Sequence, residues 1–305
     1  MTNLFISRNL FRLSCCLFFC SVAINPVFAE ERSPQIKHNS SLPVITPTTP
    51  AAKEKMTQGL QRIQQGQVAQ AIQLFNEAIA LDPELWQAHY NLGLAYRQAG
   101  DLQKAADAFY QTVVIQPNFA LGFASIGGIL LDVQNWSQAQ QYLEQAIAVD
   151  PNLAIAHYNF GLLHRQFGRT AAAIQAWETA NQLAPNLTEA AIQLAEAYLD
   201  GDRIKQAEHL ITTALKQNPR LPAVHYLQGR VAEARGNPEA ALSAFRKASD
   251  LDKNYANAYF AAAQTLIRNE RESAAIPLLD YALLLYTQQE QTEWMRAAQN
   301  LRQQL

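Results

Sequence analysis

The fold of this chain is decided by one stretch of 34 residues, Trp86 to Phe119, which reads WQAHYNLGLAYRQAGDLQKAADAFYQTVVIQPNF. Counted in steps of 34 from Ala52, most of the sequence divides into seven windows, and no insertion is needed. The windows are residues 52–85, 86–119, 120–153, 154–187, 188–221, 222–255 and 256–289. A period of this length is typical of proteins built from stacked helical units, because one unit alone cannot bury its apolar face.

Three columns of this alignment keep their residue type from window to window. One is proline in the first five windows, one is always alanine, and one is always a large apolar residue. They read Pro83, Pro117, Pro151, Pro185 and Pro219; Ala71, Ala105, Ala139, Ala173, Ala207, Ala241 and Ala275; and Phe75, Phe109, Leu143, Trp177, Ile211, Phe245 and Leu279. Recurrence at three fixed places excludes coincidence.

Each window carries the pattern of two helices joined by a turn. In the second window His89, Leu92, Gly93 and Tyr96 fall at i, i+3, i+4 and i+7, which places them on one helix face. The pair Gly100-Asp101 then predicts a helix end and a new start. Glycine accepts a positive φ there, and the aspartate carboxylate accepts hydrogen bonds from free N–H groups. The proline column ends the second helix.

A column of small residues runs through the first helices. A glycine inside a helix costs about 1 kcal/mol relative to alanine, so its retention predicts that two helices cross closely at that point. The column reads Gly59, Gly93, Gly127, Gly161, Ala195, Gly229 and Ala263.

The pattern resembles the tetratricopeptide repeat. The second window matches that motif with His89, Leu92, Gly93, Tyr96, Ala105, Phe109, Thr112 and Pro117, and the fourth with His157, Phe160, Gly161, His164, Ala173, Trp177, Ala180 and Pro185. The resemblance extends over residues 52–289 and implies an all-α solenoid of helix-turn-helix repeats. It is specific for the fold and says little about the partner, because one fold hosts many functions.

Residues 1–29 have the pattern of a signal peptide. Arg8 and Arg12 form a basic start, residues 13 to 24 form an apolar core, and small residues lead up to a predicted cleavage after Ala29. The alternative is an uncleaved membrane anchor formed by residues 13–28, although this run is short for a spanning helix. The protein is therefore expected to be exported, to a bacterial periplasm or a secreted location, and to touch a membrane only if the segment stays uncleaved.

All three cysteines, Cys15, Cys16 and Cys20, lie in this segment. A lipoprotein signal is disfavoured because two phenylalanines precede Cys20. Cleavage would leave a chain without a disulfide or a thiolate metal site. It would also remove Arg8 and Arg12 and change the net charge from −2 to −4, with 22 basic against 26 acidic residues. This net charge shows no excess of basic residues of the kind that would indicate binding of nucleic acid.

Two segments flank the repeats. Residues 30–51 are rich in proline, serine and threonine and are expected to form a linker. After the repeats, Thr287-Gln288-Gln289-Glu290 has the pattern of a capping box. It predicts a last helix through Gln304, within residues 290–305, that covers the open end of the solenoid. The packed face of this helix would be lined by Trp294, Ala298 and Leu301.

Motifs for catalysis are absent from the sequence. It contains no glycine-rich phosphate loop, no Gly-x-Ser-x-Gly, no His-Glu-x-x-His and no Cys-x-x-Cys. His89, His157 and His225 recur every 68 residues, but they occupy a packing column and lie two repeats apart, too far for shared metal ligation. We expect no enzyme, no cofactor, no metal and no small-molecule substrate.

The candidate binding residues lie one step beyond these histidines. The resemblance implies that the fifth position of each window faces a concave groove and that asparagines beside it hold a bound peptide's backbone. Aromatic, amide and guanidinium groups together suit recognition of a peptide. The alternative is that the tyrosines fill space between helices and the asparagines are solvated. The candidates are Tyr90, Asn91, Leu94, Arg97, Tyr158, Asn159, Leu162, Arg165, Tyr226, Arg230 and Phe260.

The sequence therefore predicts an exported scaffold that binds a peptide or protein segment in its groove without a covalent step. The second reading is a self-assembling structural component, a homo-oligomer joined through solenoid ends or apolar columns. The predicted terminal helix argues against joining end to end.

Overall fold

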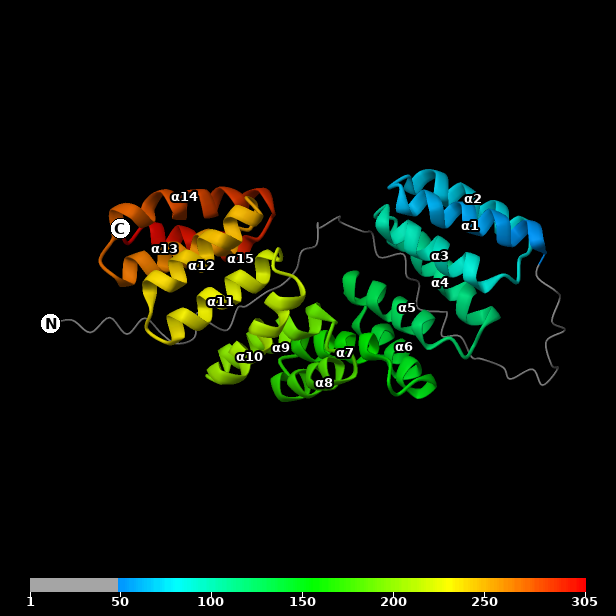
Figure 1. Ribbon diagram of the computed structural model, residues 1–305, viewed down its shortest axis with the longest axis horizontal. Helices are drawn as coiled ribbons and strands as arrows, with labels where there is room; N and C mark the ends of the chain where they lie inside the picture. The colour runs from blue at the N-terminus through cyan, green and yellow to red at the C-terminus, as the bar shows by residue number, and fades with distance from the viewer. Residues whose placement is uncertain (1–48) are drawn as a thin grey trace. The chain divides into compact units, whose positions relative to one another are not determined.

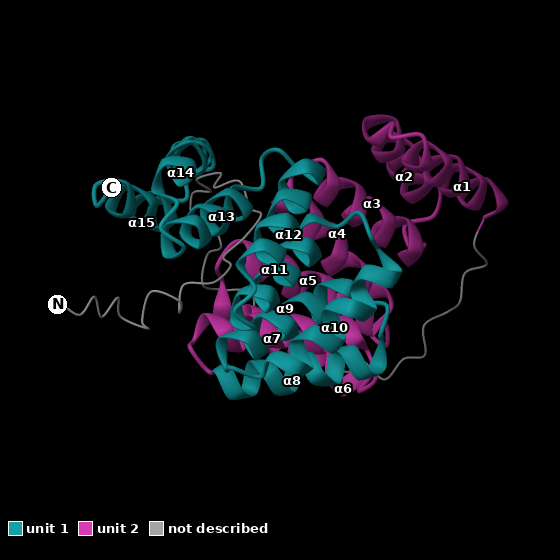
Figure 2. Cartoon of the chain, turned by 60° about the vertical axis from the view of Figure 1, so that its left-hand side comes forward, with its two compact units in different colours: residues 1–21, 170–305 teal, residues 22–169 magenta. Residues whose placement is uncertain are grey.

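The computed structural model describes residues 49–305, so the predicted signal peptide and nearly all of the predicted linker lie outside the described residues. The described chain consists of fifteen α-helices without a strand, which confirms the all-helical prediction (Figure 1). By contact the chain divides into two compact units, 49–169 and 170–305 (Figure 2). We call these the N-terminal unit and the C-terminal unit.

Each unit is a run of short helices of similar length. The N-terminal unit holds α1 (Pro50–Gln64), α2 (Val68–Leu81), α3 (Trp86–Gln98), α4 (Leu102–Ile115), α5 (Ala120–Asp132), α6 (Trp136–Val149) and α7 (Ala154–Gln166). The C-terminal unit holds α8 (Thr170–Leu183), α9 (Thr188–Asp200), α10 (Ile204–Gln217), α11 (Pro222–Ala234), α12 (Pro238–Leu251), α13 (Ala256–Arg268), α14 (Glu272–Gln288) and α15 (Thr292–Arg302).

The helices pack as antiparallel pairs, each in contact with the next. In the N-terminal unit α1 packs against α2, α3 against α4 and α5 against α6, and each second helix contacts the following first helix. In the C-terminal unit α9 packs against α10, α11 against α12 and α13 against α14. Neighbour-only packing is the defining property of repeat proteins.

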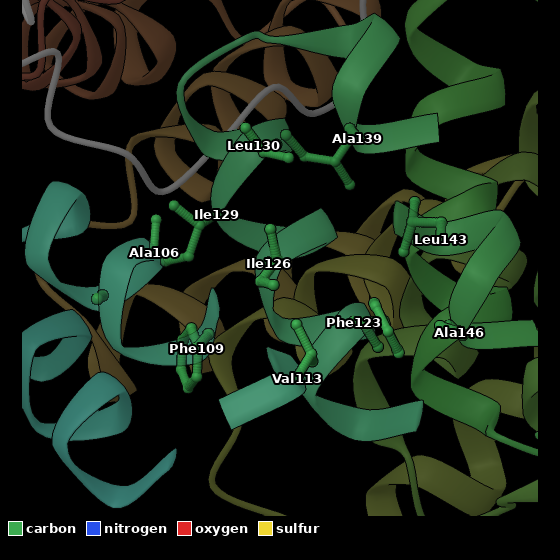
Figure 3. Close-up of a cluster of buried hydrophobic side chains, with 14 of the residues drawn as sticks. Ala106, Phe109, Val113, Phe123, Ile126, Ile129, Leu130, Ala139, Leu143 and Ala146 are labelled. Carbon is green, nitrogen blue, oxygen red and sulfur yellow. The ribbon is translucent and has the colours of Figure 1, made fainter. Parts of the chain in front are cut away.

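The predicted close crossings are present where the small column lies. A Cβ atom built on Gly93 would lie 2.6 Å from the Phe109 ring, and one on Gly127 would lie 2.7 Å from Leu143. Contacts this short do not occur between real atoms, so these positions require glycine for the first and second helices to pack. Figure 3 shows Phe109 and Leu143 within the buried cluster of the N-terminal unit.

The turns also follow the predicted chemistry. Gly100 has a φ of +83°, and the Asp101 carboxylate accepts a hydrogen bond from the Lys104 backbone N–H at 3.2 Å. In the C-terminal unit the Asn237 side chain accepts one from the Ala240 N–H at 3.1 Å.

Two predicted boundaries are wrong. Helix α1 begins at Pro50 behind the N-cap Thr49, so the linker ends before residue 51. Thr287 does not open the last helix, because α14 runs on to Gln288 and the Thr287 hydroxyl donates to the Leu283 carbonyl at 2.8 Å. The turn that follows has Glu290 at a φ of 56°, and α15 ends at Arg302. Helix α14 is longer because Tyr286, near its end, is fully buried.

Helix α15 packs on the last helix pair. Its Trp294 ring stacks on Tyr286 with ring centroids 6.0 Å apart and meets Phe260 edge-on at 5.9 Å. Ala298 of α15 is completely buried. The apolar surface of α13 and α14 is therefore covered by this helix.

Candidate peptide-binding face

We define the first-helix face as the ninth position of each window of the N-terminal unit together with its neighbours on the same side of the first helices α1, α3, α5 and α7. On this face Leu60 and Leu94 are exposed, Leu94 to 40%, and Gly128 is buried. The column reads Leu60, Leu94, Gly128 and Leu162.

The candidate tyrosines serve mainly as packing. The Tyr90 ring lies 5.4 Å from Phe109 and 5.1 Å from Phe119, centroid to centroid, and burial raises the pKa of its hydroxyl. In the C-terminal unit Tyr226 repeats this arrangement against Phe245 and Tyr255. Tyr158 of α7 is half-buried.

The candidate asparagines bind the protein's own backbone. The Asn91 side-chain N–H donates to the Gln87 carbonyl at 2.8 Å, one turn back in the same helix. Asn159 is buried, and its side-chain N–H donates to the Ala124 carbonyl at 3.3 Å. That bond joins α7 to α5, so this amide holds two first helices together.

Arg97 and Asp132 form a polar site next to Leu94. The Arg97 side chain is 47% exposed, and its Nη2 atom lies 3.9 Å from Oδ2 of Asp132, longer than a hydrogen bond. The Asp132 side chain is only 10% exposed, and among the described residues Oδ2 accepts no hydrogen bond. Burial raises the pKa of this carboxyl to about 6, although Arg97 acts in the opposite direction. Oδ2 of Asp132 is therefore a buried acceptor without a hydrogen-bond donor among the described residues.

Gly128 lies one helical turn before Asp132 and differs from its neighbour Gly127. A Cβ atom on Gly128 would meet only the Asn159 side-chain nitrogen, at 3.4 Å, which is near an ordinary contact. Packing therefore does not require glycine at this position. The other members of its column are leucines, so Gly128 removes a side chain between Leu94 and Leu162.

The remaining candidates of the N-terminal unit, Leu162 and Arg165, are both half-buried. Leu162 packs against the cluster shown in Figure 3. Leu94 and Arg97 are therefore the accessible candidates of the face, and the buried Asp132 lies beside Arg97.

Two candidates in the C-terminal unit, Arg230 and Phe260, are buried. Phe260 is buried beneath Tyr286 and Trp294. Arg230 is 8% exposed, with Nη2 2.8 Å from Asp200 and Nη1 3.7 Å from Glu196. Windows five to seven replace the leucines of the ninth column with Glu196, Arg230 and Gln264, and Arg230 is paired there.

The histidine column has a local role. His89, His157 and His225 each place Nε2 within 2.8–2.9 Å of the carbonyl of the proline six residues earlier. These bonds fix the turn before each first helix. Within residues 49–305 no group of three or more histidine, cysteine, aspartate or glutamate side chains gathers as metal ligands would. No helix in the same range is long and apolar enough to cross a membrane.

Sequence reasoning missed Gly128. The visible indication was a glycine in a column of leucines beside the packing glycine Gly127. Asp132 is not among the candidates either, because the burial of a carboxylate cannot be read from a single residue of the sequence.

These features define an all-helical repeat scaffold. The family model described as tetratricopeptide repeat matches residues 56–120, 127–188 and 226–291, and a second model of the same description matches 164–231. The matches extend over more than half of the sequence, and the chain belongs to the tetratricopeptide repeat family.

Solved structures show the same fold. A chain in the crystal structure of the APC/C hetero-tetramer Cut9-Hcn1 matches with a TM-score of 0.65 and 16% identity, over 70% of this chain and 42% of that one. PilF of Pseudomonas aeruginosa matches with a TM-score of 0.60 and 20% identity, over 68% and 95%. A tetratricopeptide repeat protein from Parabacteroides merdae matches with 0.59 and 14%, over 82% and 100%. No match to a curated protein was found.

Proposed function

We infer that the protein is an exported, non-catalytic scaffold that binds a segment of a partner protein on the first-helix face of its N-terminal unit. The tetratricopeptide fold is that of a protein-interaction scaffold. One observation carries the choice of face. Exposed Leu94 and Arg97 lie on the same face as Asp132, a buried carboxylate whose Oδ2 atom accepts no hydrogen bond among the described residues.

Leu94 and Asp132 each correspond to one part of a peptide. Leu94 offers apolar surface to a ligand side chain. Asp132 would accept a backbone N–H, and Arg97, which is half exposed, can move aside or bind a carbonyl or carboxylate. Binding requires no bond to form or break.

The test begins with peptides selected from a random display library on residues 30–305. The affinity of a selected peptide is then measured by fluorescence anisotropy for the parent protein and for the double variant Leu94→Ala, Arg97→Ala. Both side chains are exposed, so the fold should persist. We expect the double variant to lose affinity by about tenfold or more, as truncation of a binding hot spot does.

The matched control is Val114→Ala with Lys104→Ala on α4. It removes one exposed apolar side chain and one exposed cation from a second helix of the same unit. This control should bind like the parent. Peptides retained by the double variant and lost by the control would move the site to the second helices and contradict the proposal.

A further inference from the structure

A groove opens on the C-terminal unit. It has a volume of about 810 Å³ and lies along α11 and α12, with Glu208 of α10 at its edge. That volume is within the roughly 300–1,000 Å³ typical of ligand pockets. Val231 and Ala232 line it from α11, and Ala240, Ser243 and Ala244 line it from α12. We call it the Ala232 groove.

The groove exists because one large side chain is missing. Ala232 occupies the eleventh position of its window, and it is the smallest residue of that column. The column reads Arg62, Tyr96, Leu130, His164, Tyr198, Ala232 and Leu266. The preceding repeat, which is in the same unit, therefore shows what normally fills this space.

In that repeat the space is filled by Tyr198. Its ring lies 3.9 Å beneath the Arg203 guanidinium, and its hydroxyl donates a hydrogen bond of 2.6 Å to Glu178 on the second helix of the repeat before. Arg203 is also 3.5 Å from Glu178. The tyrosine is thus held by apolar packing, a cation above its face and a carboxylate at its tip.

The Ala232 groove is bordered by a different pair of charged residues, because one window later the positions of Arg203 and Glu178 hold Asn237 and Thr212. Arg235, just beyond α11, pairs with Glu208 on α10, the second helix of the repeat before. Both residues line the groove. A cation and a carboxylate therefore lie beside the small side chain of Ala232, at other positions of the repeat than in the preceding window.

The rim of the groove is basic. Its lining holds three cations, Arg235, Arg246 and Lys247, against two anions, Glu208 and Asp250. Glu208 is already paired with Arg235, and Asp250 accepts from Lys253 at 2.8 Å. Arg246 is 85% exposed and lies 3.9 Å from Asp250. The groove therefore favours a ligand with negative charge next to its apolar part.

We propose that the Ala232 groove binds an acidic peptide segment of a partner through one aromatic side chain, which takes the place that Tyr198 fills in the preceding repeat. The aromatic ring would lie over Ala232 beside Arg235, and flanking carboxylates would pair with Arg246 and Lys247. This site is additional to the proposed first-helix face and does not depend on it.

The experiment uses residues 30–305 and a fluorescein-labelled probe of sequence Glu-Glu-Tyr-Glu-Glu-Leu, amidated at its C-terminus. Binding is measured by fluorescence anisotropy. We expect saturation below about 1 mM, a range in which single-site peptide contacts are measurable. A probe with alanine in place of tyrosine, and one with lysine in place of each glutamate, should bind about tenfold more weakly or not at all.

Two variants locate the site. Ala232→Tyr restores the residue type of Tyr96 and Tyr198 and should abolish binding by filling the groove. Arg246→Glu with Lys247→Glu reverses two exposed charges, so the fold should persist, and it should weaken binding and reduce its dependence on salt. Saturable binding that both variants retain would overturn the proposal, and so would an unbound tyrosine probe. If Leu94→Ala with Arg97→Ala abolished binding of the probe and Ala232→Tyr did not, the probe would bind at Leu94. That result would also overturn the proposal.

Discussion

Two neighbouring glycines in α5 have different surroundings, and helix packing restricts the side chain at only one of them. Gly127 faces Leu143 at a distance that no Cβ atom could tolerate, and Gly128 faces only the amide of Asn159. In the sequence they differ only in the column of the repeat to which each belongs. Their different roles depend on which face of α5 each occupies.

This difference predicts opposite effects of the same substitution. Gly127→Ala forces Leu143 away and should destabilise the fold by about 1–3 kcal/mol. Gly128→Ala should leave stability unchanged or raise it by up to about 1 kcal/mol, because alanine is the better helix former. Urea unfolding followed by circular dichroism measures both. Equal losses in the two variants would show that Gly128 is also a packing residue.

Asp132 predicts a dependence of stability on pH. Because the pKa of its carboxyl is raised from 3.8 to about 6 in the folded protein, the folded state binds this proton more tightly than the unfolded state. Stability from this group is therefore fully present below pH 3.8 and is lost as the pH rises through 6. The cost of the buried charge at neutral pH is about 3 kcal/mol at most.

Asp132→Asn tests this assignment, because the amide has the same shape and no charge. We expect the variant to be more stable than the parent in urea at pH 7.5, and the advantage should shrink towards pH 4. Asp107→Asn on α4, an exposed carboxyl of the same unit, is the matched control. A variant that is less stable than the parent at pH 7.5 would show that the ion pair with Arg97 outweighs the cost of burial.

At the scale of the helices, the sequence was sufficient to predict a helix boundary wherever the residues that set it lie at the boundary itself and recur from window to window. Pro117, Gly100 and Asp101 mark helix ends through their own backbone chemistry, and the structure follows them. The capping box at Thr287 failed because a distant contact decided the boundary. Tyr286 is buried against α13 and α15, and this burial extends α14 past residues that would cap a free helix.

For the candidate site, the sequence could predict which side chains share a helix face but not which of them are accessible. Periodicity placed Tyr90, Leu94 and Arg97 on one helix face, and that placement holds. Whether a side chain on that face is accessible depends on the next repeat. Phe119 covers Tyr90, and α15 covers Phe260. From the sequence alone, a tyrosine and a leucine on the same helix face have the same expected solvent accessibility. The packing of the neighbouring helices decides which of them is exposed.

At the scale of the whole molecule, a repeat of 34 residues separates architecture from function. The columns that recur, such as Ala71 and Phe75, fill the interior. The place where a column of large residues lapses, Ala232, is where a groove opens on the C-terminal unit. Deviations from the repeat are therefore better guides to binding than the repeat itself, because packing explains the recurrent residues without any ligand.

The proposed export also concerns the whole chain, and it predicts the composition of the mature protein. If the segment 1–29 is removed, protein isolated from its native host begins at Glu30 and contains no cysteine. Intact-mass spectrometry should give the mass of residues 30–305, and Ellman's reagent should detect no thiol after denaturation. Ala29→Leu, which removes the small residue that a signal peptidase needs, is the variant for comparison. It should retain the segment, its three thiols and an association with membranes. Native protein that already carries these thiols and partitions with membranes would establish the anchored alternative, in which residues 30–49 tether the repeats to a bilayer.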